Sequence, residues 1–172
     1  MNYSYLKPYV HTNPEDKVDG NFFVSLSEEE ILEAEQIIGA QFPSELRAFY
    51  QEIGYGFLTH PHILPVGYKF YSSNLIHAPS SIALILNKGV ESGLIMESTL
   101  ELLSPGDWPM FEIGDSTNFL IMKPFSDNPN AIWDDGGDVK IDDSFAHFIW
   151  RLFYESPSFY GDIIEDFYKN KP

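Results

Sequence analysis

The sequence contains no cysteine, so disulfide bonds and thiolate metal sites are both excluded. It also has few basic residues: Lys and Arg total 10 against 26 Asp and Glu, a formal net charge of −16. A polyanion repels nucleic acid and anionic membrane surfaces, so we expect neither as a partner. The same charge would speed association with a basic protein, although many acidic proteins have no cationic partner.

Long hydrophobic runs are also missing. The longest, Ile82–Leu86, is far too short for a membrane-spanning helix. The first residues, Met1–Pro8, carry no basic patch followed by an apolar segment, so no signal peptide is indicated. We therefore expect a cytoplasmic protein.

Motifs of catalysis and cofactor binding are absent as well. There is no Gly-x-Ser-x-Gly elbow, no phosphate-binding glycine loop and no His-Glu-x-x-His zinc motif. We predict a non-enzymatic protein with no catalytic residues, no cofactor and no bound metal. A hydrolase that uses carboxylates is the weaker alternative, because a pair can always be chosen among 26 acids without knowledge of its geometry.

Aromatic residues, in contrast, are abundant, with 14 Phe, 10 Tyr and 3 Trp available for a core. A chain of 172 residues fits one domain and buries roughly 70% of its extended surface on folding. No internal repeat, low-complexity tract or linker is visible. We predict a single domain over residues 1–172.

Two capped helices are predicted over residues 27–39 and 44–54. Ser27 and Glu30 have the spacing of a capping box, in which a hydroxyl and a carboxylate each bind a free backbone N–H. Gly39 supplies a left-handed C-terminal stop, and the second helix begins directly after a proline.

The later part of the chain changes to a period of two, which is typical of strands. Four short strands separated by turn-forming Gly and Asp are predicted. They cover residues 110–113, 118–123, 131–133 and 139–141. A helix with a continuous apolar stripe then begins at Asp143 or Ser144, and a last helical segment covers residues 160–169. The pattern predicts an α+β fold: a central antiparallel sheet flanked by an N-terminal helical pair and C-terminal helices.

Other segments allow less definite predictions. Residues 1–25 form a lead-in, in which residues 21–24 are either a short strand or an apolar support for the helix cap. Residues 66–71 favour a strand, and residues 97–103 a short helix. Residues 82–87 fit a helix, but most of them also fit a buried strand.

Two patterns resemble metal sites but lack the required ligands. His60 and His62 are separated by a proline, and no third ligand is indicated, so a histidine pair without metal is the better interpretation. The run Asp134–Asp138 lacks the spacing of a calcium loop, and its twelfth position is Phe145 instead of a bidentate Glu. A solvated hairpin turn is the better interpretation there.

Five aspartates nevertheless concentrate within this region. The acidic cluster consists of Asp134, Asp135, Asp138, Asp142 and Asp143. Like charges this close raise one another's pKa values and weaken the fold unless a cation or a basic protein neutralises them. We predict the acidic cluster to be the partner-binding site; the alternative is a solvated face with no partner.

Taken in their order along the chain, these features resemble the SUKH superfamily, which contains the Smi/Knr-like proteins. The matching features are the capped helix ending at Gly39, the sequence Phe42-Pro43-Ser44, the strand entering Phe111–Asp115, and Ala131–Asp134 followed by Ile141–Ile149. The resemblance covers about residues 24–154. The lead-in, an extended middle at residues 74–107 and a C-terminal extension after Ser156 depart from the family.

The resemblance implies a SUKH-like α+β fold and an immunity role. Bacterial members are typically cytoplasmic, non-enzymatic antitoxins that bind and neutralise a cognate secreted toxin. The acidic charge of this chain favours a toxin with a basic surface, such as a nuclease. Fungal relatives imply the alternative, a regulatory scaffold in cell-wall signalling that binds a housekeeping protein. The family has no catalytic signature, so none of the matched positions is transferred as a functional site.

Overall fold

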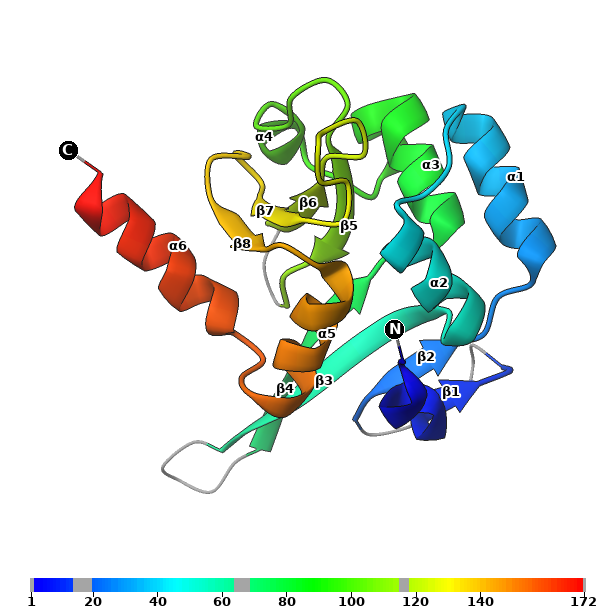
Figure 1. Ribbon diagram of the computed structural model, residues 1–172, viewed down its shortest axis with the longest axis horizontal. Coiled ribbons are helices and arrows are strands. Elements are labelled where there is room, and N and C mark those ends of the chain that lie inside the picture. Colours follow the sequence, from blue (N-terminus) through cyan, green and yellow to red (C-terminus); the bar gives the residue numbers. More distant parts are fainter. Residues whose placement is uncertain (1, 14–19, 64–68, 115–117, 172) are drawn as a thin grey trace.

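The computed structural model describes residues 2–13, 20–63, 69–114 and 118–171, with the backbone alone for residues 60–63 and 69–73. Within these residues, eight strands form one sheet in which neighbours follow chain order (Figure 1). They are β1 (Val10–His11), β2 (Phe22–Val24), β3 (Tyr55–Ile63), β4 (Lys69–Ile76), β5 (Trp108–Glu112), β6 (Phe119–Met122), β7 (Ile132–Asp134) and β8 (Lys140–Asp142). Strands β1 and β2 are parallel and all other neighbours antiparallel. The predicted α+β fold with a central antiparallel sheet is confirmed.

The four strands predicted from the period of two correspond to β5–β8. The longest hairpin, β3–β4, was not predicted, apart from the suggestion of a strand at residues 66–71. Residues 66–68 lie outside the described part of the chain, and the rest begin β4. Strand β3 contains His60, Pro61 and His62, which interrupt any alternation, yet its ladder with β4 runs from Gly56 to Ile63. The backbone pairing therefore overrides a weak sequence pattern.

The lead-in of residues 1–25 is structured in its described part. The 3-10 helix η1 (Ser4–Tyr9) comes first, and residues 22–24 form a strand, which decides between the two alternatives for residues 21–24. Tyr3 is 1% exposed, and its hydroxyl donates a hydrogen bond to the backbone carbonyl of Glu45 at 3.0 Å. The N-terminal segment is thus attached to the second helix of the chain.

Helices α1 (Glu28–Ile38) and α2 (Ser44–Glu52) form as predicted. The side chain of Ser27 accepts a hydrogen bond from the N–H of Glu30 at 3.2 Å, and the Glu30 carboxylate accepts one from the N–H of Ser27 at 2.8 Å. Gly39 follows α1 with a φ of 78°. The capping box and the glycine stop are both confirmed.

Helix α2 ends two residues before its predicted boundary because Ile53 leaves the helical conformation, with φ −121° and ψ −47°. Gly54 then precedes β3 and Gly56 is its second residue, with φ values of 105° and 148°. Their backbones lie against β2: a Cβ atom would be 1.8 Å from the carbonyl oxygen of Val24 at Gly54, and 2.1 Å from that of Phe22 at Gly56. Only glycine permits this close approach.

The ambiguous run of residues 82–87 belongs to a helix, α3 (Pro79–Lys88). Pro79 stands in its first turn, where the missing N–H costs no intrahelical hydrogen bond. The chain continues through the 3-10 helix η2 (Gly89–Ser92) and α4 (Glu97–Leu100), which is shorter than predicted.

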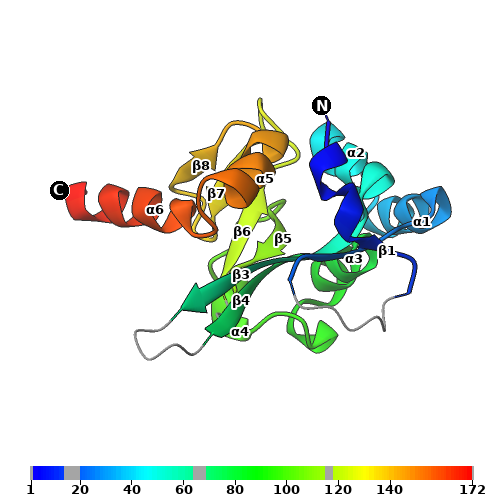
Figure 2. The ribbon, with the colours of Figure 1, turned by 90° about the horizontal axis from the view of Figure 1, so that it is seen from below.

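Both C-terminal helices, α5 (Phe145–Tyr154) and α6 (Phe159–Asn170), form as predicted. Helix α6 ends at the C-terminal tip of the molecule in Figures 1 and 2, and Tyr168 in its outer half contacts Asp134 at the end of β7. Ile163 and Ile164 pack against the core, whereas Phe167, predicted on the same face, is 38% exposed. The outer half of α6 therefore presents apolar surface to solvent.

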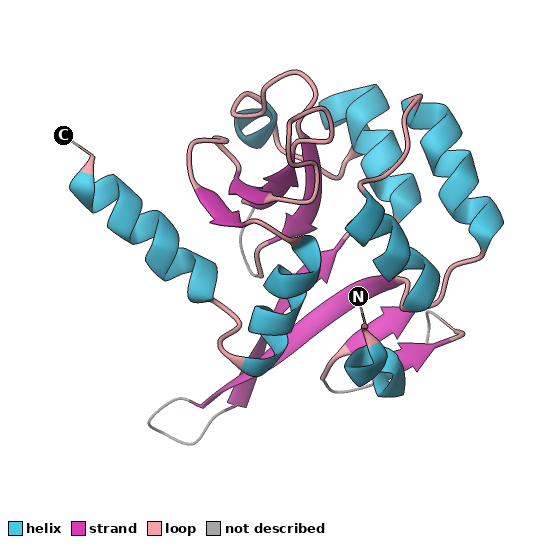
Figure 3. Ribbon diagram, viewed as in Figure 1, coloured by secondary structure: helices cyan, strands magenta, loops and turns pink. Residues whose placement is uncertain are grey.

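Side chains cover both faces of the sheet at β6. Leu120 and Met122 belong to the main core, which also contains residues of α1, α2 and α5. Phe119, which points to the other face because side chains alternate along a strand, forms a second cluster with Ile85 and Ile95. Figure 3 shows the helices around the strands; α3 contributes Ile85 to the second cluster, and Ile95 comes from the segment between η2 and α4.

Candidate partner-binding site at the acidic cluster

The acidic cluster lies at the ends of β7 and β8, on the turn between these strands, and on the segment from β8 to α5. Its five carboxylates are not equally accessible. Asp134 is 3% exposed, and the side chain of Asp142 is 6% exposed. The side chains of Asp138 and Asp143 are 55% and 72% exposed, and Asp135 is partly exposed. A partner could therefore reach three of the five predicted residues.

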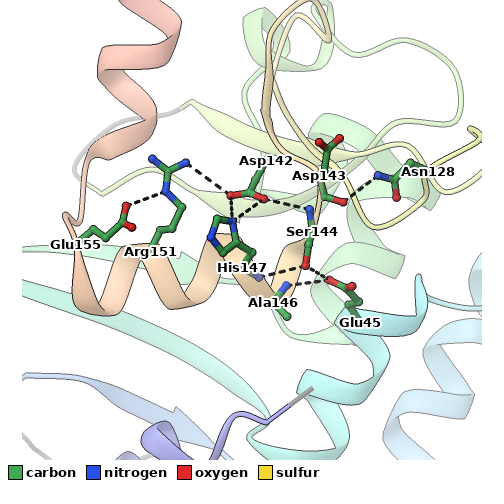
Figure 4. Close-up of polar contacts among 9 residues, drawn as sticks. All are labelled: Glu45, Asn128, Asp142, Asp143, Ser144, Ala146, His147, Arg151 and Glu155. Carbon is green, nitrogen blue, oxygen red and sulfur yellow. Dashed lines mark hydrogen bonds and ion pairs between the residues drawn. The ribbon is translucent and has the colours of Figure 1, made fainter.

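The two buried aspartates make contacts within the protein. Asp134 accepts hydrogen bonds from the backbone N–H of Val139 at 2.9 Å and from the hydroxyl of Tyr168 at 3.2 Å, which fastens the turn and joins it to α6. Asp142 lies 2.9 Å from Nδ1 of His147 and 3.7 Å from Nη1 of Arg151, both on α5 (Figure 4). These two carboxylates position the elements around the site.

The two most exposed aspartates are paired with lysines of the same chain. The carboxylate of Asp138 lies 3.0 Å from Nζ of Lys171, and that of Asp143 lies 2.6 Å from Nζ of Lys140. Such surface pairs contribute little to stability, but each places a positive charge where a basic partner would approach. Two cations of the chain itself therefore offset part of the negative charge of the cluster, and its binding of a partner stays a prediction.

Asp135 of the acidic cluster has a raised pKa. Its partial burial raises the pKa first, and the negative charge of Asp134 raises it further. The folded state therefore holds the proton of Asp135 more tightly than the unfolded chain does. The free energy of unfolding must fall as pH rises through the window between the unfolded pKa and the higher folded pKa, and it stays reduced at neutral pH.

Replacing Asp135 by Asn should accordingly stabilise the protein near neutral pH. Because the side chain is partly exposed, we expect a gain of up to about 1 kcal/mol near pH 7, and no gain near pH 3, where the carboxyl is protonated in both states. Urea unfolding of Asp135→Asn and the native protein at both pH values would measure this. Asp127→Asn, at an exposed position, is the control and should change neither value. Equal gains at both pH values would contradict the electrostatic cause.

A second polar network joins α5 to α2 across the site (Figure 4). The hydroxyl of Ser144 caps α5 by accepting a hydrogen bond from the N–H of His147 at 3.2 Å. The same hydroxyl donates to Oε2 of Glu45 at 2.7 Å, and the N–H of Ala146 donates to that oxygen at 2.9 Å. The carboxylate of Glu45 thus accepts a hydrogen bond from a free backbone N–H in the first turn of α5. Its negative charge also interacts favourably with the helix dipole there.

Loss of this interhelical cap should destabilise the fold. We expect Glu45→Ala to lower the free energy of unfolding by about 1–3 kcal/mol, because it leaves the N–H of Ala146 without its acceptor. Chemical denaturation would measure the change, with Glu97→Ala as an exposed control that should stay within about 0.5 kcal/mol. If Glu45→Ala lowered the free energy of unfolding as little as Glu97→Ala does, water would be shown to replace the lost hydrogen bonds of the cap.

Exposed aromatic rings lie beside the acidic cluster on α5. The side chain of His147 is 57% exposed, and Trp150 and Tyr154 are 41% and 56% exposed. The ring centroids of His147 and Trp150 are 6.0 Å apart, and those of Trp150 and Tyr154 are 5.4 Å apart. Sequence reasoning placed His147 at the boundary of the core and missed the other two. These two residues could have been found from the sequence, because they recur at helical spacing on the face of α5 opposite its buried stripe.

The described part of the chain brings together no group of three or more His, Cys, Asp or Glu side chains able to hold a metal ion. The side chains of His60 and His62 lie outside the described residues. None of the helices in the described ranges combines the length and the apolar composition needed to cross a membrane.

Comparison with known families gave one match. The model of the SMI1 / KNR4 family (SUKH-1) matches residues 25–151, well over half of the chain and close to the predicted range of residues 24–154. Comparisons with curated proteins and with solved structures found no match. The acidic cluster falls inside the matched range, whereas α6 falls outside it.

Proposed function

We propose, from the premise that this chain belongs to the SMI1 / KNR4 family (SUKH-1), that it is an immunity protein which binds and neutralises a cognate secreted toxin. The family match is the observation that carries this proposal. Membership is consistent with an immunity role, and the family generally comprises non-enzymatic immunity and regulatory proteins. In this proposal the protein acts in the cytoplasm by binding alone.

The charge of the chain indicates which toxins suit it. A net charge of −16 attracts a basic surface over several ångströms and raises the rate of encounter. Nucleases present basic grooves to the phosphates of their substrates, and carboxylates can occupy such grooves in place of phosphates. A basic nuclease domain is therefore the proposed target, and occlusion of its active site the proposed mechanism.

The exposed members of the acidic cluster contribute to this attraction. Asp135, Asp138 and Asp143 can face a partner, and the rings of Trp150 and Tyr154 lie nearby on α5. Trp and Tyr are enriched among residues that dominate binding energies in protein interfaces. The lysines paired with Asp138 and Asp143 reduce the local negative potential, so we expect these residues to act mainly on the association rate.

Co-expression with the toxin domain encoded beside this gene tests the proposal. We expect rescue of growth and a purified complex whose association slows as salt is added, because screening weakens the attraction. Failure to rescue growth and to bind any neighbouring toxin domain would remove the proposal. Recovery of one abundant cytosolic protein from cells with and without the toxin gene would favour the regulatory scaffold instead.

A further inference from the structure

A second surface, distant in sequence from the acidic cluster, has stronger features of a docking site. Val90, Leu94 and Met96 are 44%, 37% and 53% exposed, and they line one shallow hollow of about 430 Å³ between η2 and α4. The buried side chains of Ile95 and Phe119 also line it. Contiguous exposed apolar surface of this kind commonly marks an interaction site in a soluble protein.

The hollow is built on a packed support. Ile85, Ile95 and Phe119 form the second hydrophobic cluster, against which Leu100 and Leu103 also pack. The ring of Phe119 is stacked on a buried histidine of the segment after β4, with centroids 5.4 Å apart. The segment that carries the hollow is therefore fixed to the sheet, which lowers the entropy cost of binding.

Carboxylates line this apolar surface and lie near it in sequence. Glu97 and Glu112 line the hollow, and Glu91 and Glu101 lie on the same segment, whose only basic residue between positions 86 and 112 is Lys88. Within the described part of the chain, Glu91, Glu97 and Glu101 form no ion pair. Asp138 and Asp143 of the acidic cluster have lysine partners, whereas these three glutamates have no such partner among the described residues and stay available to a cationic ligand.

We propose that this hollow docks a protein segment that presents an apolar side chain between Lys or Arg residues. The apolar side chain would fill the space lined by Val90, Leu94 and Met96, and the flanking cations would meet the glutamates around it. Flexible Met and Leu side chains can adapt to the shape of such an anchor. The inference rests on the proposed function, because the basic toxin is the protein expected to contain this segment.

A short amphipathic peptide made only of Leu and Lys serves as the probe. Titrated into the ¹⁵N-labelled protein, it should shift the amide signals of residues 90–97 and Glu112 most strongly, and added salt should weaken its binding. Met96→Asp should weaken binding about tenfold, because it places a polar group in the hollow. The new charge would by itself strengthen attraction to the peptide, so the expected weakening can come only from loss of the apolar contact.

Leu32→Asp is the matched control, because Leu32 is 41% exposed on α1 and the substitution adds the same charge. It should leave binding unchanged or slightly stronger. Shifts centred on the acidic cluster or spread over the whole surface would overturn the inference, and so would equal binding by Met96→Asp. Self-association of the native protein that Met96→Asp abolishes would assign the hollow to a second copy and also overturn it.

The toxin experiment separates the two proposals. If the native protein neutralises its toxin and Met96→Asp does so equally well, the hollow is not the docking site, although the immunity function stands. If the native protein neutralises no toxin, the immunity function fails, and the peptide titration still decides whether the hollow binds cationic apolar segments.

Discussion

Phe49→Ala is expected to lower the free energy of unfolding by roughly 3–5 kcal/mol. Phe49 lies on α2 and is completely buried. Its ring contacts Tyr3, Phe23 and Phe145 in edge-on geometry, with centroid distances of 5.1, 5.8 and 5.4 Å. Tyr3 directly precedes η1, Phe23 lies in β2 and Phe145 begins α5, so one side chain joins three separate parts of the fold. Truncation to Ala leaves a cavity that rigid neighbours cannot refill.

Urea unfolding monitored by tryptophan fluorescence would measure this loss. Phe125→Ala is the matched control, since it deletes the same atoms from a side chain that is 74% exposed and should change stability by less than about 1 kcal/mol. Similar losses for both variants would contradict the central position of Phe49. Retained secondary structure by circular dichroism would show that Phe49→Ala still folds under native conditions.

Local signals predicted the helices of this protein well. Ser27, Glu30 and Gly39 specify the ends of α1 through hydrogen bonds and backbone conformation that involve only neighbouring residues. The apolar stripe of α5 is equally local, because its buried positions, Phe145, Phe148, Ile149 and Leu152, recur at helical spacing. Such patterns are complete within a dozen residues, so they can be recognised without knowledge of the tertiary fold.

The β3–β4 hairpin and the interhelical cap could not be found in this way. Strand β3 owes its conformation to pairing with β2 on one side and β4 on the other, and its own residues alternate poorly. Glu45 reaches the first turn of α5 from a helix 101 positions earlier in the chain. In both cases the determining partner lies far away in sequence.

For a similar reason, the sequence located the aspartates of the candidate site but did not reveal which of them are buried or paired. Composition correctly located a concentration of aspartates, but it carried no information on burial or pairing. The structure buries Asp134 and Asp142, and it supplies Lys140 and Lys171 to the exposed pair. A count of charges therefore describes the long-range field of the protein, whereas exposed apolar side chains beside unpaired carboxylates indicate where contact can form.

Gly54→Ala is expected to destabilise the protein by about 3–5 kcal/mol, because two costs add at this position. The backbone has a φ of 105°, which an L side chain adopts only with strain. A Cβ atom would also stand 1.8 Å from the carbonyl oxygen of Val24 and 3.0 Å from Cα of Ser25. Relief requires β2 to move away from β3, and β2 carries Phe23 into the centre of the core.

Gly39→Ala separates these two costs. Gly39 also has a positive φ, 78°, but apart from the adjacent residues of the chain no atom lies within 4 Å of the position that its Cβ would occupy. We therefore expect a loss of only about 1–2 kcal/mol for Gly39→Ala, the cost of the left-handed conformation alone. Parallel denaturation of the two variants measures the difference, which reports the steric contact with β2. Equal losses in the free energy of unfolding would mean that the β2 backbone can move at little cost. The close approach of the two strands would then not require glycine.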